Sequence, residues 1–207
     1  MNTSQPDNPA PEELSERSLR AGTYNLLANL LRTAPDQQLL HRLQGIAIES
    51  PDEPPADNMS HAWVRLRKIA EQADPEALAD EYQTLFVGLG RGELMPYGSW
   101  YLTGFLMEKP LAQLRQDLAA LGYERQEGVT EPEDHIAALC EVMALLIMDK
   151  AVTWEAQQQF FDAHLGSWVD TFFHDLEHAN SAQFYRPVGY LGREFIKLEK
   201  RYLAMLV

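Results

Sequence analysis

The chain is poor in cysteine and in positive charge. Its 207 residues include one cysteine, Cys140, so no internal disulfide can form. This cysteine lies in the apolar run IAALCEVMALLIM, where a thiol behaves as a small hydrophobic side chain. Lys and Arg number 17 against 31 Asp and Glu, which gives a net charge of −14. Because phosphate binding needs clustered Lys and Arg, we expect no nucleic-acid partner and no anionic-membrane surface.

Long apolar runs are also missing. The longest uncharged apolar run, residues 142–148, falls well short of the ~18–20 residues that a membrane-spanning helix needs. The first residues, MNTSQPDNPAPEE, contain three prolines and lack a positive region followed by an apolar stretch, so they are not typical of a secretory signal. We expect residues 1–12 to be disordered, and the protein to be cytoplasmic with no direct membrane insertion.

The apolar residues that are present follow a helical pattern. Hydrophobic residues make up 45% of the chain. They recur at three- and four-residue spacing, with no sustained alternation typical of strands. We therefore expect an all-α protein in which residues 13–207 form a single helical-bundle domain of about nine or ten helices. The expected helices cover about 12–32, 36–48, 60–72, 75–87, 109–121, 131–150, 155–165, 167–180 and 182–206, with a short segment over 97–107.

Two stretches interrupt the helical pattern. Residues 88–96, GLGRGELMP, contain three glycines and a proline, so the backbone must turn there. Gly122 is placed to end a helix, and a loop leads from it to Thr130, which forms a capping-box pattern with Glu133 at the start of the most apolar helix. We expect an internal hinge near residues 122–131.

The sequence HDLEH, residues 174–178, matches the zinc-hydrolase pattern His-x-x-Glu-His. His174 and His178 would be the ligands on one helix face, and Glu194 or Glu199 would have to supply a third. Such a short pattern also arises by chance on solvated helices, which is the interpretation we favour. A zinc-dependent hydrolase remains an alternative function.

The glycines of GLGRG, residues 88–92, resemble a phosphate-binding loop only superficially. A dinucleotide site needs a preceding strand, and a P-loop ends in Gly-Lys-Ser/Thr; the sequence has neither feature. Glycines between two helices more often permit a tight reversal. Arg91 leaves weak anion contact open.

Residues 131–141, EPEDHIAALCE, carry the most notable cluster of acidic side chains. In a continuous helix, Asp134 and Glu141 are seven residues apart and differ by only about 20° around the axis, with small alanines between them. Acidic residues at a helix N-terminus favour the dipole, which explains Glu131 but not Glu141. With His135, the carboxylates could also form an acid–base site, but no nucleophile, metal spacing or cofactor loop accompanies them. A face that binds a peptide with basic residues and an apolar stretch is the better hypothesis.

Five segments together resemble the TorD/DmsD family of redox-enzyme maturation chaperones. They are EYQTLFVGLG (81–90), PYGSWYL (96–102), PLAQLRQDLAALG (110–122), EPEDHIAALCEVMALLI (131–147) and FFDAHLGSWVDTFFHDLEHANSAQFY (160–185). The likeness spans nearly everything after the first dozen residues.

The resemblance implies a cytoplasmic chaperone without enzymatic activity and without a cofactor. Such proteins bind the twin-arginine leader and the mature part of a molybdenum-cofactor oxidoreductase subunit, assist cofactor insertion and delay export until folding is complete. The residues that the resemblance and the acidic cluster assign to leader binding are Asp134, His135, Glu131, Glu141, Pro96, Gly98, Ser99, Tyr101 and Tyr24.

The chain departs from the family pattern at two places. Relatives commonly have proline after the first glycine of the loop and an acidic residue soon after the Tyr-Leu pair, where this chain has Leu89 and Thr103-Gly104. One negative charge near the expected groove is therefore missing. A generic helical interaction module is a further alternative function, and the sequence leaves open whether the protein is a monomer or a homodimer.

Overall fold

The computed structural model describes residues 11–47, 57–125, 128 and 130–205, and it is helical throughout these ranges apart from connecting segments. Within them lie ten α-helices and one π-helical segment, which confirms the all-α fold. They are α1 (Pro11–Arg32), α2 (Gln37–Gln44), α3 (Asn58–Ala70), α4 (Pro75–Tyr82), η1 (Gln83–Val87), α5 (Gly98–Thr103), α6 (Lys109–Ala120), α7 (Ile136–Met148), α8 (Trp154–His164), α9 (Val169–His178) and α10 (Tyr185–Ala204).

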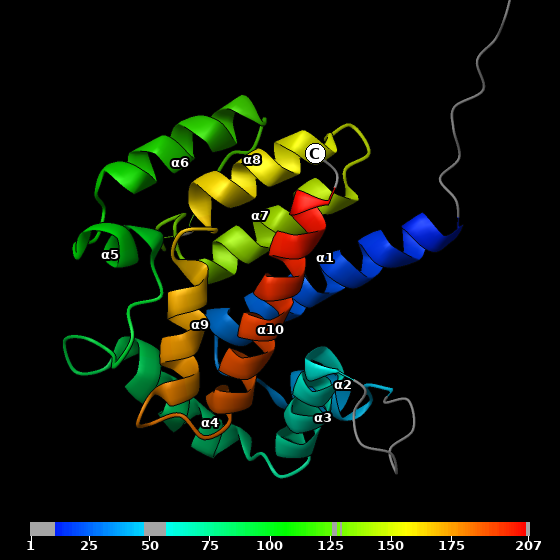
Figure 1. The fold of residues 1–207 in the computed structure, drawn as a ribbon. Coiled ribbons are helices and arrows are strands. Elements are labelled where there is room, and N and C mark those ends of the chain that lie inside the picture. Colours follow the sequence, from blue (N-terminus) through cyan, green and yellow to red (C-terminus); the bar gives the residue numbers. More distant parts are fainter. Residues whose placement is uncertain (1–10, 48–56, 126–127, 129, 206–207) are drawn as a thin grey trace, which may run out of the picture.

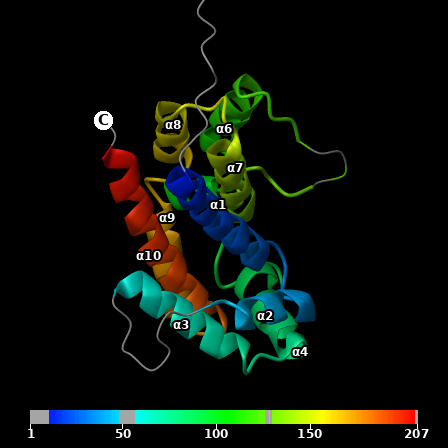
Figure 2. The same ribbon diagram turned by 90° about the vertical axis from the view of Figure 1, so that its right-hand side faces the viewer.

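The helices form two groups joined by long helices. Figures 1 and 2 show α6, α7 and α8 at one end of the molecule and α2, α3 and α4 at the other. The long helices α1 and α10 reach both groups, with α1 packed on α7 and α10 packed on α9 and α3. A single core therefore runs through the described part of the chain.

The α1–α7 pair is the centre of this core. Helix α7 has one charged residue, Glu141, and its buried side chains include Ile136, Leu139, Met143 and Ile147. Such a helix is stable only when most of its surface is covered by neighbours. The sequence-based placement of this segment in the core agrees with the structure.

Local capping signals set several helix starts. The side chains of Asp36, Asp57, Asp74 and Thr153 each accept a hydrogen bond from the backbone N–H three residues on. Each therefore satisfies one of the N–H groups that lack a partner in the first helical turn. Helix α4 begins as the sequence predicts, with Asp74 as N-cap and Pro75 in the first turn.

Two predicted boundaries were wrong, and one predicted helix ends where expected but changes its geometry. Helix α2 ends at Gln44 instead of near residue 48, because Gly45 follows it. The helix expected over 75–87 changes to π-helical geometry at Gln83–Val87, and the Gly88 N–H closes it on the Gln83 carbonyl. The helix expected from residue 131 begins at Ile136, because the residues before it pair with another segment.

A buried ion pair ties three helices together. The Arg20 guanidinium on α1 donates to both carboxylate oxygens of Glu199 on α10, at 2.7 and 3.0 Å. It also lies against the rings of Trp154 and Tyr202, 4.8 and 4.4 Å from their centroids. Bidentate pairing and cation–π contact together compensate the loss of hydration of the buried charge.

Parts of the predicted domain organisation lie outside the described residues. These are residues 1–10 of the expected disordered segment and residues 126, 127 and 129 of the expected hinge. The disordered segment and the hinge therefore stay predictions. None of the helices in the described ranges has the length and hydrophobicity needed to cross a bilayer.

Replacing Glu199 by Gln should lower the free energy of unfolding by about 3–5 kcal/mol, because a buried Arg20 would lose its counter-charge. Replacing both residues by apolar ones (Arg20→Met with Glu199→Leu) should recover most of that loss. Urea denaturation measures both effects. The control is Glu71→Gln in the exposed pair Arg67–Glu71, which should cost about 0–1 kcal/mol; equal effects of the two Gln variants would contradict the role assigned to the buried pair.

Helices α9 and α10 approach closely at a glycine. A Cβ on Gly189 would lie 2.5 Å from the Glu177 backbone nitrogen, so Gly189→Ala forces the helices apart. We expect a loss of about 1–3 kcal/mol in unfolding free energy from this overpacking. Gly22→Ala is the matched control, since its Cβ meets nothing within 4 Å; that change should instead stabilise α1 by up to about 1 kcal/mol. Thermal denaturation of the two variants tests the difference in sign.

Candidate functional site

Two segments about 35 residues apart meet as a short antiparallel bridge before α5 and α7. Tyr97 pairs with His135; the Gly98 N–H donates to the Asp134 carbonyl at 2.9 Å, and the Ile136 N–H donates to the Pro96 carbonyl at 2.9 Å. The backbone at His135 is extended, so the chain cannot be helical there. We call residues 96–99 together with 132–136 the junction.

Asp134 is a buried residue that links the two segments of the junction. Its side chain is 3% exposed, and its Oδ2 accepts a hydrogen bond from the Ser99 N–H at 2.8 Å. Its other carboxylate oxygen and the Ser99 hydroxyl are both buried without a hydrogen-bond partner among the described residues. The sequence-based picture of Asp134 and Glu141 on one helix face was therefore wrong, because Asp134 precedes the helix.

His135 is the N-cap of α7. Its Nδ1 accepts a hydrogen bond from the Ala137 N–H at 3.1 Å, which requires this nitrogen to be unprotonated. Burial and, to a smaller extent, Arg32 lower the pKa of His135 to about 4, against the opposing effect of Glu131 and Asp134. The ring is therefore neutral near pH 7 and has a structural role. The expected capping box of Thr130 and Glu133 does not form.

The other acidic residues of the cluster each have a partner. Glu131 accepts a hydrogen bond from the Tyr97 hydroxyl, and Glu141 pairs with Arg32 of α1. Glu133 pairs with Arg115 of α6 at 2.9 Å and with Arg125 at 3.7 Å. The carboxylates thus point in different directions, and they do not form one continuous acidic strip.

The stretch 96–101 packs on α9 through aromatic contacts. Tyr101 stacks on Trp168 with ring centroids 5.5 Å apart, and its hydroxyl donates to Asp175 at 3.0 Å. Gly98 faces the same indole, where an added Cβ would lie 3.2 Å from the Trp168 Nε1. These contacts fix the position of α5, and Pro96 and Ser99 are themselves buried.

A pocket of about 240 Å³ opens beside the junction, between α5, α6, α7 and α8. Apolar side chains, Leu102, Pro110, Leu114 and Leu139, make up much of its lining. His164 lines the same pocket; its Nε2 lies 2.8 Å from a carboxylate oxygen of Asp117, and burial lowers its pKa although Asp117 opposes this. The pocket is therefore mostly apolar with a neutral histidine at its wall.

The edge of this pocket carries unusually exposed apolar side chains. Between α5 and α6, the large apolar residues of the segment 102–107 are exposed: Leu102 by 42%, Phe105 by 68%, Leu106 by 39% and Met107 by 72%. Met107 also has a positive φ of 58°, a backbone conformation that is uncommon outside glycine. We call residues 102–107 the apolar edge. Concentrated exposed apolar surface of this kind marks interaction sites.

Tyr24 lies apart from the junction. It is completely buried and packs edge-on against Phe195 of α10, with ring centroids 4.8 Å apart. Burial, with Glu199 nearby, raises its pKa well above the usual value. Its place in the α1–α10 interface gives it a packing role in this conformation.

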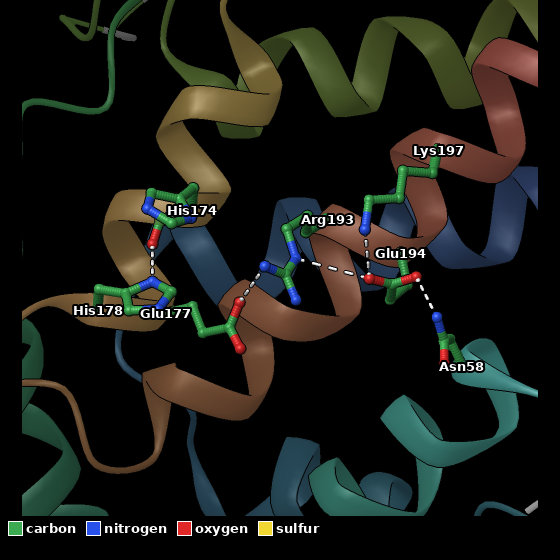
Figure 3. Close-up of polar contacts among 7 residues, drawn as sticks. All are labelled: Asn58, His174, Glu177, His178, Arg193, Glu194 and Lys197. Carbon is green, nitrogen blue, oxygen red and sulfur yellow. Dashed lines mark hydrogen bonds and ion pairs between the residues drawn. The ribbon is translucent and has the colours of Figure 1, made fainter.

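The two histidines of HDLEH do not form part of a larger metal-ligand cluster. Figure 3 shows that Glu177 pairs with Arg193, and that Glu194 pairs with Lys197 and bonds Asn58. His178 Nδ1 donates to the His174 carbonyl at 2.8 Å. In the described part of the chain, no group of three or more His, Cys, Asp or Glu is arranged to hold a metal ion. The geometry gives no support to the zinc alternative.

The glycine-rich loop makes a tight reversal, as the sequence indicates. Gly88 and Gly90 have positive φ values of 62° and 98°. Arg91 lies over the Trp100 ring, and Glu93 accepts hydrogen bonds from the backbone N–H groups of Asn180 and Ser181. The loop is thus bound to α5 and to the α9–α10 connection.

Sequence reasoning missed the pocket and the apolar edge. The residues FLM after Gly104 were visible as an apolar run, but nothing local shows that they stay exposed. The family motifs likewise do not reveal that Gly98 and Asp134 border the same pocket; this follows from the tertiary pairing at the junction.

Comparisons with known proteins agree with this fold. The sequence family described as “nitrate reductase delta subunit” matches residues 52–174. The chaperone protein TorD of Vibrio atlanticus (strain LGP32) is 30% identical over 173 residues, which cover 78% of this chain and 80% of the relative. TorD of Vibrio cholerae serotype O1 (strain M66-2) is 25% identical over 207 residues, covering 95% of this chain and 87% of the relative.

A solved structure shows the same fold. A protein from Archaeoglobus fulgidus described as a redox enzyme maturation protein superposes with a TM-score of 0.55 at 17% identity, covering 94% of this chain and 99% of that one. At 17% identity this likeness shows the fold alone. Membership of a family is shown by the family match and by the TorD relatives. The chain therefore belongs to the TorD/DmsD family of redox-enzyme maturation chaperones.

Proposed function

We propose that this chaperone acts in the cytoplasm on a molybdenum-cofactor oxidoreductase subunit, binding its twin-arginine leader and its mature part until cofactor insertion is complete. The observation that carries the leader proposal is the apolar edge, residues 102–107, beside the apolar pocket. A twin-arginine leader combines two adjacent arginines with an apolar stretch. The surface next to the junction offers an apolar counterpart to that stretch.

Most of the affinity must come from apolar burial. An exposed ion pair contributes about 0–1 kcal/mol, whereas micromolar binding requires about −8 kcal/mol. At about 25 cal/mol per Å², a few hundred Å² of apolar surface supplies a gross gain of this order before the peptide is ordered. Phe105 and Met107 at the edge, with Leu102 at the pocket mouth, are well placed to provide it.

The leader arginines supply selectivity through the carboxylates beside the junction. Glu131 is exposed, and Glu141 is half-buried with its carboxylate still accessible to solvent. Asp134, His135 and the stretch 96–101 hold this surface in shape: we assign them to the leader site through the geometry they fix. Tyr24 contributes from the core, where it holds α1 against Phe195 of α10.

Peptide titration tests this proposal. In calorimetry, a leader peptide with adjacent arginines should bind, and the same peptide with both arginines replaced by Gln should bind more weakly and with less salt dependence. Phe105→Ser should weaken the binding of both peptides by about tenfold. The leader would bury this exposed side chain, and the substitution removes that apolar burial. Leu198→Ser, on α10 and 50% exposed, is the matched control and should leave affinity unchanged. Absence of binding by the wild-type chain would refute the proposal.

Asp134→Asn separates charge from positioning. The variant keeps the side-chain shape but weakens the bond from the Ser99 N–H, so we expect unfolding free energy to fall by about 1–2 kcal/mol. Because the carboxylate is almost fully buried, the salt dependence of leader binding should remain that of the wild type. Chemical denaturation and calorimetry at two ionic strengths provide both readouts. A reduced salt slope would instead show that Asp134 meets an arginine directly.

A further inference from the structure

One arginine of the chain lies on an aromatic ring at the proposed leader site. The guanidinium carbon of Arg91 is 5.3 Å from the centroid of the Trp100 ring. Arg91 is exposed, and within the described ranges no carboxylate lies within ion-pair distance of it. In a chain with 31 acidic residues, an arginine that faces a tryptophan instead of a carboxylate is notable.

The glycine-rich loop is built to place Arg91 there. Gly88 and Gly90 adopt positive φ, and an added Cβ on Gly92 would lie 2.5 Å from the Leu85 carbonyl oxygen, so the loop closes tightly on itself. After Arg91, the Leu94 N–H donates to the Leu85 carbonyl at 2.8 Å, while Glu93 holds the α9–α10 connection. The residues that follow Arg91 in sequence, towards the junction, are therefore held in place by hydrogen bonds.

Trp100 belongs to the surface that the leader is proposed to use. It lies in α5 one helical turn after Tyr97, whose hydroxyl bonds Glu131, so it is on the Glu131 side of this helix, whereas Gly98 and Leu102 line the pocket on the other side. Its neighbour Tyr101 stacks on Trp168, which fixes α5 and so the position of the indole. Trp100 is only half-buried, so one part of its surface is available to a cation from outside.

We propose that the Trp100 ring is the receptor for a leader arginine, and that Arg91 occupies it in the free protein as an intramolecular competitor. This inference rests on the proposed leader binding. The leader guanidinium would make the same contact with the ring that the Arg91 guanidinium makes. When one replaces the other, no additional charged group has to lose its hydration. The apolar edge then binds the apolar stretch that follows the arginines.

The exchange has a measurable consequence. Removing Arg91 frees the ring, so Arg91→Ala should bind the twin-arginine leader more tightly, by about two- to fivefold, the size of one exposed cation–π contact. The leader with both arginines replaced by Gln gains nothing from a free ring, so its affinity should stay unchanged. Discrimination between the two peptides therefore increases in the variant.

A change in overall charge needs its own control. Arg91→Ala makes the chain more negative by one charge, which by itself attracts a cationic peptide. Arg201→Ala removes the same charge from an exposed position at the end of α10 and should show only this general effect. Calorimetry at 0.15 M salt compares the two variants with both peptides.

A last comparison measures the effect of Arg91→Ala in a chain that also carries Trp100→Phe, with Trp100→Phe alone as its reference. A phenyl ring binds a guanidinium more weakly than an indole does, so in the Phe background the gain from removing Arg91 should shrink towards the Arg201→Ala value. Equal gains for Arg91→Ala and Arg201→Ala, or a full Arg91→Ala gain in the Phe background, would overturn the inference while leaving leader binding intact. Absence of leader binding by the wild-type chain would remove the proposed function and this inference together.

Discussion

The pairing of residues 96–98 with residues 134–136 is the contact on which the site depends. Two backbone hydrogen bonds and the bond from the Ser99 N–H to Asp134 join segments that are distant in sequence and buried in the fold. Each such bond has a modest net value, about 0.5–1.5 kcal/mol, but breaking one would leave buried polar groups unpaired. The junction consequently fixes where α5 and α7 begin, and the pocket between them follows from that.

Acidic side chains serve the fold in ways that a net charge does not reveal. The Glu81 carboxylate accepts hydrogen bonds from the backbone N–H groups of Gln183, Phe184 and Tyr185 at the start of α10. Glu93 does the same for the preceding residues of that connection. Glu81 thus satisfies donors at the start of α10, and Glu93 satisfies donors of the connection before it, that would otherwise need water. Part of the charge of −14 is therefore structural.

Local signals predict the helices well and the site poorly. Periodicity locates every described α-helix of eight residues or more, and the Asp74–Pro75 start is correct because capping is decided within one turn. The start of α7 was misjudged because Thr130 and Glu133 offer an equally local capping signal, whereas the actual start depends on the pairing of His135 with Tyr97, which is distant in sequence. The apolar edge has the same cause: exposure at Phe105 is a tertiary property, absent from the residue types themselves.

The two components of the proposed site differ in what they can provide. Apolar burial at the edge is strong but unselective, since many apolar peptides would gain from it. A cation on Trp100 adds little free energy, yet it distinguishes a guanidinium from a neutral side chain. Arg91 lowers the apparent affinity of every arginine-bearing guest by the fraction of time it covers the ring. A chaperone that must later release its client gains from such a competitor, because Arg91 is tethered beside the ring and returns to it as soon as the guest arginine leaves.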